Sequence, residues 1–184
     1  MDIPGLAYFP NFITDMQQEH IVASIDNHRW SNELKRRVQH YGYKYDYKKR
    51  AINESMKVCD LLPWMKVYGQ KFVDCNLFPK MPDQAIVNEY ERGQGINRHI
   101  DCEPCFQNAI ASLSLLSSCI MQFTRNDKLV ELYLEPKSLL VINGEARYHW
   151  YHGIPARWAD AGISRSRRIS VTFRNVILEG ELND

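Results

Sequence analysis

The chain has 184 residues, of which 45% are hydrophobic and 24% charged, and its 23 Lys and Arg nearly balance its 22 Asp and Glu. At about 100–200 residues per domain, this length predicts a single domain, and the composition excludes collagen-like, coiled-coil and disordered proteins. A net charge of +1 excludes a protein that coats nucleic acid through bulk charge alone.

Membrane and export signals are not expected. A spanning helix needs about 20 consecutive apolar residues, which the sequence does not contain, and the first ten residues are not typical of a signal peptide. Five cysteines without regular spacing favour a reducing compartment over a disulfide framework. We therefore expect a monomer in the cytoplasm, or in the nucleus of a eukaryote.

Two helices are predicted in the first 82 residues. The first covers residues 14–30, because Thr14 and Gln17 have the spacing of a capping box and apolar residues follow on one face. The second runs from about Pro63 to Asn76, because proline is favoured in the first turn of a helix and apolar residues recur at helical spacing.

Between these helices lies a basic segment in which tyrosines occupy every second position. This spacing predicts a strand or hairpin with all four rings on one face. Cations that meet phosphates and rings that stack on bases are typical of single-strand nucleic-acid binding. The alternative, favoured on this segment alone, is a sheet whose tyrosines pack on the core while its lysines are solvated. The cations are Lys35, Arg36, Arg37, Lys44, Lys48, Lys49 and Arg50, and the rings are Tyr41, Tyr43, Tyr45 and Tyr47.

After Pro82 the sequence consists of short apolar runs separated by turn residues. Many short strands without helices between them predict an antiparallel sandwich or closed barrel. The fold class is therefore mainly β with flanking helices (α+β), the two N-terminal helices packing outside. We expect strands near 84–91, 109–116, 118–124, 129–134, 138–142, 148–154 and 167–177, and a flexible loop at 156–166.

A metal site is indicated by His99, Asp101 and His152. Residues two apart in a strand point to the same side, so the His99 imidazole and the Asp101 carboxylate project together. His152, in another predicted strand, supplies a second imidazole. Two histidines and one carboxylate on one face of an octahedron leave three positions open, as in non-haem Fe(II) oxygenases.

The predicted strand from Arg168 to Arg174 places both arginines on one face, with Ser170 and Thr172 between them. Two arginines inside a barrel are costly unless they are paired. A dicarboxylate such as 2-oxoglutarate would pair with both, because a guanidinium offers a planar fork to a carboxylate.

Taken together, these segments resemble the AlkB family of Fe(II)/2-oxoglutarate dioxygenases. Two N-terminal stretches resemble in particular the members similar to the tRNA wobble-uridine hydroxylase. The resemblance implies a double-stranded β-helix (jelly roll) over residues 1–184, with helices and a nucleotide-recognition lid in 1–82 and a catalytic core in 83–184. The similar stretches are 5–14, 36–47, 88–90, 93–96, 99–101, 144–154 and 168–174.

The resemblance also implies roles for individual residues, with Fe(II), 2-oxoglutarate and O2 as cofactors. His99, Asp101 and His152 would bind iron. Arg168 and Tyr90 would hold the distal carboxylate of 2-oxoglutarate. Arg174 and Asn88 would lie near the iron-bound end of 2-oxoglutarate. The expected catalytic residues are the three iron ligands and Arg174. Ser170 stands where the family often has Asn, and it can still form a hydrogen bond. Substrate contacts are expected from Glu103, Lys35, Arg36, Arg37, Tyr41, Tyr43 and Tyr45.

The implied activity is oxidation of alkylated or modified nucleobases that are single-stranded or flipped out of a duplex. Glu103, at the position of an acidic residue in several demethylases, favours oxidative demethylation in DNA or RNA. The alternatives are wobble-uridine hydroxylation, a dioxygenase with a protein or small-molecule substrate, and a non-catalytic jelly-roll module.

The other cysteines and histidines that could bind a metal are expected to have structural roles only. Cys102 and Cys105 are expected to be two ordinary cysteines, since no second pair completes a zinc site. His149 is expected on the opposite strand face from His152. The remaining histidines, His20, His28 and His40, are expected on the surface or in helices, while Trp158 is a weaker candidate for a substrate contact.

Overall fold

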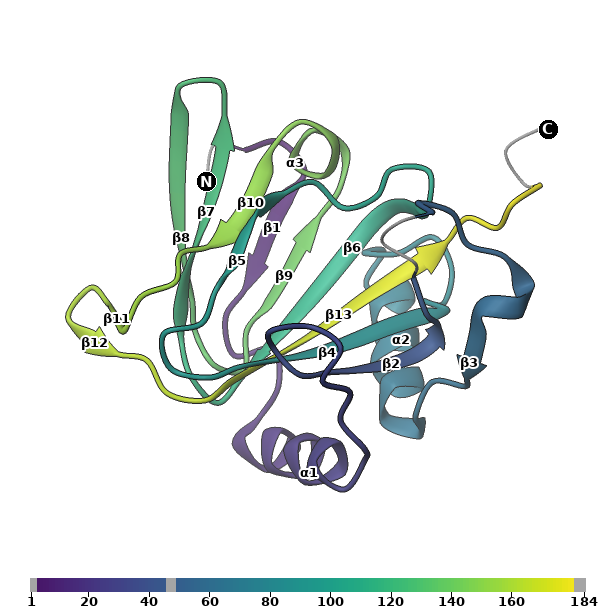
Figure 1. Ribbon diagram of the computed structural model, residues 1–184, viewed down its shortest axis with the longest axis horizontal. Coiled ribbons are helices and arrows are strands. Elements are labelled where there is room, and N and C mark those ends of the chain that lie inside the picture. The colour runs from purple at the N-terminus through teal and green to yellow at the C-terminus, as the bar shows by residue number, and fades with distance from the viewer. Residues whose placement is uncertain (1–2, 46–48, 181–184) are drawn as a thin grey trace.

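The computed structural model describes residues 3–45 and 49–180, and in it two β-sheets face each other with two helices packed outside (Figure 1). The helices are α1 (Asp15–Asp26), α2 (Pro63–Asp74) and the short α3 (Gly144–Tyr148), and a 3₁₀ turn covers Glu54–Met56. The strands are β1 (Leu6–Phe9), β2 (Val38–Tyr43), β3 (Lys57–Cys59), β4 (Gln84–Tyr90), β5 (Ile96–His99), β6 (Phe106–Leu115), β7 (Cys119–Arg125), β8 (Lys128–Leu134), β9 (Leu139–Ile142), β10 (Tyr151–Ile154), β11 (Ala159–Asp160), β12 (Ile163–Ser164) and β13 (Arg168–Val176). No helix in these described ranges is long and apolar enough to cross a membrane.

The larger sheet has seven strands in the order β1-β9-β6-β13-β4-β2-β3, and the smaller has four in the order β5-β10-β7-β8. Neighbouring strands are antiparallel in both sheets. Strands β1, β2 and β3, from the N-terminal part of the chain, belong to the same sheet as β4, β6, β9 and β13. The predicted mainly β jelly-roll architecture is confirmed.

The two helices cover the outer face of the larger sheet. Ile21 and Ile25 of α1 and Met65 and Phe72 of α2 belong to the same apolar cluster as Val171 of β13. The capping box at Thr14 is present, and Pro63 begins α2, so local signals predicted both starts correctly. The second apolar cluster lies between the sheets and contains Tyr90, Phe123 and Trp150.

Strand β13 alternates as the sequence predicts. Ile169, Val171 and Phe173 pack in the outer apolar cluster, while Ser170, Thr172 and Arg174 line the cavity between the sheets. One face of this strand therefore carries the core and the other carries the chemistry.

The four tyrosines do not share one face, which corrects the prediction. Tyr41 is 5% exposed and packs with the helices, whereas Tyr43 packs beside Ile52 and donates to Glu54. The register shifts between Gly42 and Tyr43, where Gly42 has φ of +72° and a Cβ would lie 1.9 Å from the Asp83 carbonyl oxygen. This irregularity breaks the two-residue period. Tyr47 lies outside the described residues.

Three further segments differ from prediction. The strand predicted at 148–154 begins only at Tyr151, and residues 144–148 form helix α3. Within 156–166 the short strands β11 and β12 pair, and buried Asp160 bonds to Arg157 and Arg165. Cys102 and Cys105 form a disulfide, so they are not two separate cysteines.

Candidate metal centre and active site

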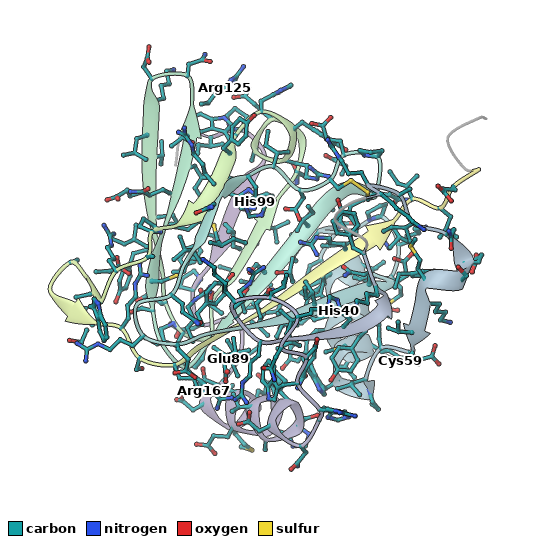
Figure 2. All side chains as sticks on the ribbon, in the orientation of Figure 1. His40, Cys59, Glu89, His99, Arg125 and Arg167 are labelled. Carbon is teal, nitrogen blue, oxygen red and sulfur yellow. A yellow bond between two sulfur atoms is a disulfide. The ribbon has the colours of Figure 1, made fainter. Side chains whose placement is uncertain are left out.

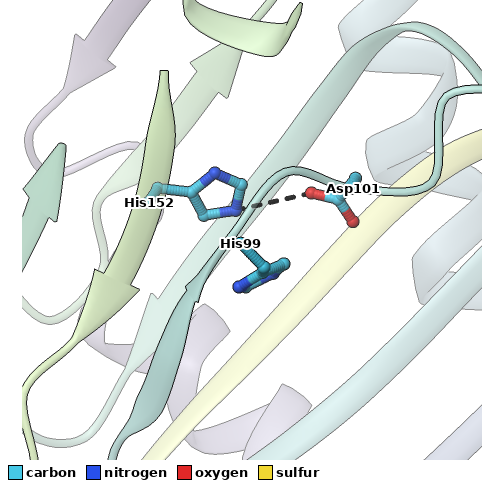
Figure 3. Close-up of side chains that lie close together, drawn as sticks. All are labelled: His99, Asp101 and His152. Carbon is cyan, nitrogen blue, oxygen red and sulfur yellow. Dashed lines mark ion pairs between the residues drawn. The ribbon is translucent and has the colours of Figure 1, made fainter. Parts of the chain in front are cut away.

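The structure brings His99, Asp101 and His152 together (Figure 3). His99 at the end of β5 lies directly opposite His152 on β10, and Asp101 follows β5 by two residues. One potential ligand atom from each residue lies within 4.8 Å of the others. Two imidazoles and one carboxylate at these separations fit a divalent iron ion with open coordination positions.

A hydrogen bond orients His99, and His152 lies in contact with Asp101. His99 Nδ1 lies 2.9 Å from the carbonyl oxygen of Asn97, so Nδ1 carries the proton and Nε2 presents its lone pair to the site. His152 Nε2 lies 3.4 Å from Asp101 Oδ2 (dashed in Figure 3). Burial lowers the pKa of His99, which keeps its imidazole neutral and available as a ligand.

Asp101 is 7% exposed and ionised. Burial by itself would raise the pKa of its carboxyl group, but the Arg174 guanidinium and His152 hold that pKa well below its ordinary value. Arg174 Nη2 donates to Asp101 Oδ1 over 2.5 Å, which leaves Oδ2 facing the imidazoles. The carboxylate thus has one oxygen for the arginine and one for a metal.

The loop that carries Asp101 is held by Arg147 of α3. This side chain has no exposed surface and donates to the carbonyl oxygens of Asp101 (2.9 Å), Cys102 (3.2 Å) and Phe106 (3.4 Å). Burial lowers its pKa. Three carbonyl groups of this loop therefore accept hydrogen bonds from one buried cation. The sequence analysis did not identify Arg147.

The two strands that carry the histidines lie unusually close together. A Cβ added to Gly153 on β10 would lie 2.8 Å from the backbone nitrogen of Arg98 on β5. Real side chains essentially never make such a contact, so position 153 accepts only glycine without a backbone shift.

A cavity of about 710 Å³ opens above the triad and is lined from both sheets. This volume lies within the range of about 300–1,000 Å³ typical of small-molecule sites. All three predicted metal ligands line the cavity, together with Asn88, Tyr90, Ser170, Arg174, Arg36, Tyr45 and Glu103.

Arg168 lies behind this wall rather than in it. It is 3% exposed, its Cζ is 5.5 Å from the centroid of the Tyr90 ring, and its Nη2 donates to Ser114. Its Nε and Nη1 have no hydrogen-bond partner among the described residues, and the same holds for Arg174 Nε. Two guanidinium groups with buried, unused donors fit a dicarboxylate ligand.

The three predicted lid cations lie in different places. Arg36 points to the cavity, where its Nε donates to Asn88 Oδ1 over 2.9 Å and its Cζ lies 5.7 Å from the Tyr90 ring centroid. Arg37 pairs instead with the buried carboxylate of Glu89 and is not among the cavity residues. Lys35 is exposed.

The predicted aromatic substrate contacts also separate. Tyr45 lines the cavity and its ring packs edge-on against Phe106 at 5.5 Å. Tyr41, buried in the core, and Tyr43, bonded to Glu54, are not among the cavity residues. We therefore withdraw Tyr41 and Tyr43 as candidate substrate contacts.

His40 is a cavity residue that the sequence analysis placed wrongly. Its side chain is 8% exposed, it lines the cavity and its Nε2 lies 2.8 Å from Glu33 Oε1. Residues two apart in a strand point to the same face, so in a strand His40 shares a face with Val38 and Arg36. This spacing could have placed His40 on the same side as Arg36. His149, in contrast, is exposed, and it follows α3 before β10 begins, so it is not in a strand with His152 as predicted.

A family model described as the 2OG-Fe(II) oxygenase superfamily matches residues 5–174. Among curated proteins, the chain is 35% identical to the Arabidopsis thaliana protein named "Alkylated DNA repair protein ALKBH8 homolog", over 96% of this chain and 59% of that protein. It is 34% identical to the Xenopus tropicalis "tRNA (carboxymethyluridine(34)-5-O)-methyltransferase alkbh8", over 94% of this chain and 32% of that protein. The chain thus spans less than two thirds of both relatives.

Among solved structures, OsALKBH1 has a similar fold, with a TM-score of 0.75 and 16% identity over 94% of this chain and 97% of that one. The family model covers the metal triad and both arginines, and the relatives at 34–35% identity cover nearly the whole chain. The chain therefore belongs to the 2OG-Fe(II) oxygenase superfamily and is similar to its AlkB homologues.

Proposed function

We propose that this chain is an Fe(II)- and 2-oxoglutarate-dependent dioxygenase that oxidises a carbon substituent of a modified nucleobase. The observation that carries the proposal is the triad of His99, Asp101 and His152 beside two arginines with unused donors, all within or behind one cavity. His99, Asp101 and His152 would hold the iron, and O2 would be the co-reactant.

Bound Fe(II) and 2-oxoglutarate supply the oxidising chemistry, in which O2 and 2-oxoglutarate give succinate, CO2 and one hydroxyl group on a substrate carbon. The protein's part is to bind and orient. Arg168, beside Tyr90, would pair with the distal carboxylate, and Ser170 would donate a hydrogen bond to it. Arg174 and Asn88 would contact the iron-bound end of 2-oxoglutarate. Arg174 would also keep Asp101 ionised.

The substrate is proposed to be a single-stranded or flipped base. The cavity has room for a base beside the cosubstrate, and enzymes that act on base atoms extrude the base into such a pocket. Arg36, Arg50 and Arg98 line it and supply cations for phosphates. Tyr45 and Glu103 would contact the base, and Lys35, exposed beside Arg36, would meet the nucleic-acid backbone.

Oxidative demethylation is the first form of this activity. A methyl group on a ring nitrogen, once hydroxylated, leaves as formaldehyde and restores the base. Glu103 at the cavity would favour the positive charge of N1-methyladenine or N3-methylcytosine.

A second form is hydroxylation of a uridine side chain in tRNA, where the hydroxyl group stays on the product. The similarity to the Xenopus protein, whose name includes a carboxymethyluridine activity, supports this form. The arginines at the cavity also favour an anionic substituent. We propose for either form that residues 1–184 form one dioxygenase domain, which acts as a monomer in the cytoplasm, or in the nucleus of a eukaryote.

One assay tests the proposal and separates its two forms. Purified protein with Fe(II), ascorbate and 2-oxoglutarate is given oligonucleotides carrying N1-methyladenine or N3-methylcytosine, as DNA and as RNA, and bulk tRNA. Formaldehyde and succinate that depend on the oligonucleotide indicate demethylation, whereas succinate with a tRNA nucleoside heavier by one oxygen indicates hydroxylation.

The control variants are His99→Ala with Asp101→Ala, which remove metal ligands, and His149→Ala, which removes an exposed histidine. The proposal requires products with His149→Ala and none with the double variant. Iron-loaded protein that forms neither product with any nucleic acid would overturn it.

A further inference from the structure

His40 lies on the wall of the cavity, away from the metal ligands. On β2 it pairs with Ile86 of β4, and Ile86 pairs with Thr172 of β13. Directly opposite residues in antiparallel strands point to the same face, and all three line the cavity. Figure 2 labels His40 on the larger sheet and His99 on the smaller one.

The Nε2 atom of His40 is hydrogen-bonded to the carboxylate of Glu33. Nε2 lies 2.8 Å from Glu33 Oε1, and Lys44 Nζ donates to Glu33 Oε2 over 2.6 Å. The hydrogen bond from Lys44 is the main cause that lowers the pKa of Glu33, so this carboxylate is ionised. An ionised carboxylate only accepts hydrogen bonds, so the proton lies on Nε2 of His40.

The other ring nitrogen, Nδ1, is therefore an acceptor. His40 Nδ1 is buried and has no hydrogen-bond partner among the described residues. Burial lowers the pKa of His40 despite the opposing effect of Glu33, so the ring is neutral at neutral pH and Nδ1 carries a lone pair. A buried acceptor that is left unpaired costs free energy, which a donor brought by a ligand would recover.

We propose that His40 Nδ1 accepts a hydrogen bond from an N–H group of the base in the cavity, so that His40 selects bases with a donor at that edge. This inference rests on the proposed function, because it needs a nucleobase as the occupant. It names the recognition chemistry: a neutral imidazole whose tautomer is set by Glu33 and Lys44.

A matched pair of bases tests the proposal. N3-methylcytosine carries an amino group where N3-methyluracil carries a carbonyl oxygen, and both have the same N-methyl group. Sites that hydrogen-bond a substrate N–H discriminate strongly against analogues without it. We expect the wild type to bind a single-stranded oligonucleotide with N3-methylcytosine at least about tenfold more tightly than its N3-methyluracil counterpart.

Binding is measured by fluorescence anisotropy with Mn(II) and 2-oxoglutarate present, so that no turnover is needed. DNA and RNA versions are both used, together with unmodified oligonucleotides for the background affinity. His40→Phe keeps a ring of similar size without the acceptor. We expect it to lose the part of the preference that the acceptor provides and to keep only the part due to the positive charge of N3-methylcytosine. His20→Phe, at an exposed histidine of α1, should keep the wild-type preference.

Glu33→Gln gives a sharper result. Lys44 would hold the oxygen of the new amide, which leaves the amide NH2 facing His40 Nε2. The proton would then move to Nδ1, which becomes a donor. We therefore expect Glu33→Gln to shift the preference toward N3-methyluracil beyond the ratio of His40→Phe, an outcome that loss of structure would not produce. Thermal melting of each variant confirms that it is folded.

Each outcome is decisive. A preference that falls in His40→Phe and falls further in Glu33→Gln supports the proposal. A wild type that binds both methylated oligonucleotides above background while His40→Phe keeps the wild-type ratio overturns the role of His40 and leaves the proposed function standing. A wild type that binds none of the methylated oligonucleotides above background overturns both.

Discussion

His99 and His152 are cross-strand partners, with ring centroids 4.5 Å apart. Their positions in the chain differ by more than fifty residues, yet the antiparallel register of β5 and β10 places them side by side. The spacing of the two imidazoles is therefore a property of strand pairing, and Asp101 completes the set from the loop that follows β5.

Removing any of these three side chains should abolish metal binding. We expect His99→Ala, Asp101→Ala and His152→Ala each to weaken Mn(II) or Co(II) binding at least about 100-fold, because two protein ligands remain. Isothermal titration calorimetry measures the affinity. His149→Ala, three residues before His152 and exposed, should bind as the wild type does, and equal loss in this variant would contradict the assignment.

Arg168 should matter for the cosubstrate and not for the metal. Hydrogen bonds to charged groups contribute about 1.5–3 kcal/mol, so Arg168→Met should raise the Kd of 2-oxoglutarate by roughly 10- to 150-fold. Titration in the presence of Mn(II) measures this change. Arg125→Met makes the same substitution at a surface ion pair with Glu145 and serves as the control. Unchanged 2-oxoglutarate affinity in Arg168→Met would rule out the assigned contact.

Arg147→Met should affect both stability and the metal site. Losing its donors leaves buried carbonyls unpaired, which costs about 1–3 kcal/mol for each such group, and a loss of 1 kcal/mol lowers the Tm of a domain this size by about 2–4 °C. We expect weaker Mn(II) binding as well, because Asp101 belongs to the same loop. Phe72→Leu, in the outer cluster, provides a destabilised control that should keep metal affinity.

Glu89 should make stability depend on acid pH. This carboxylate is 2% exposed and pairs with Arg37 and Arg167. Burial opposes its ionisation, but the two arginines lower its pKa below the ordinary value of 4.5. Its contribution to stability is therefore complete above pH 4.5 and is lost as the pH falls through the lowered pKa of the folded state.

Urea unfolding of the wild type and Glu89→Gln at a series of pH values measures this effect. We expect the variant to be less stable by about 1–3 kcal/mol at pH 7 and the difference to shrink below pH 4.5. A difference that stays constant from pH 7 to pH 3 would contradict the role of the charge.

Local patterns predicted the parts of this protein that obey a single period. The alternation of β13 and the proline that begins α2 are both set by neighbouring residues, and both predictions are confirmed. The two arginines on one face of β13 were predicted for the same reason. Their relation to Tyr90 and Ser114 depends on strand order, which periodicity does not contain.

The failures occur where the backbone departs from a period. The irregularity at Gly42 turns Tyr43 away from Tyr41, and the five residues of α3 are too few to show helical spacing. His40 was misplaced because its environment comes from β4 and Glu33, which are distant or on a loop. The Cys102–Cys105 disulfide has no signal in the sequence beyond its spacing.

The close approach at Gly153 determines the size of the metal centre. Because the backbones of β5 and β10 meet there without a side chain between them, a single added methyl group would act as a spacer that moves His152 away from His99. Metal sites tolerate only about 0.2 Å of change in ligand distance. The distance between these two proposed iron ligands thus depends on the absence of a side chain at Gly153, a residue that is not itself a proposed ligand.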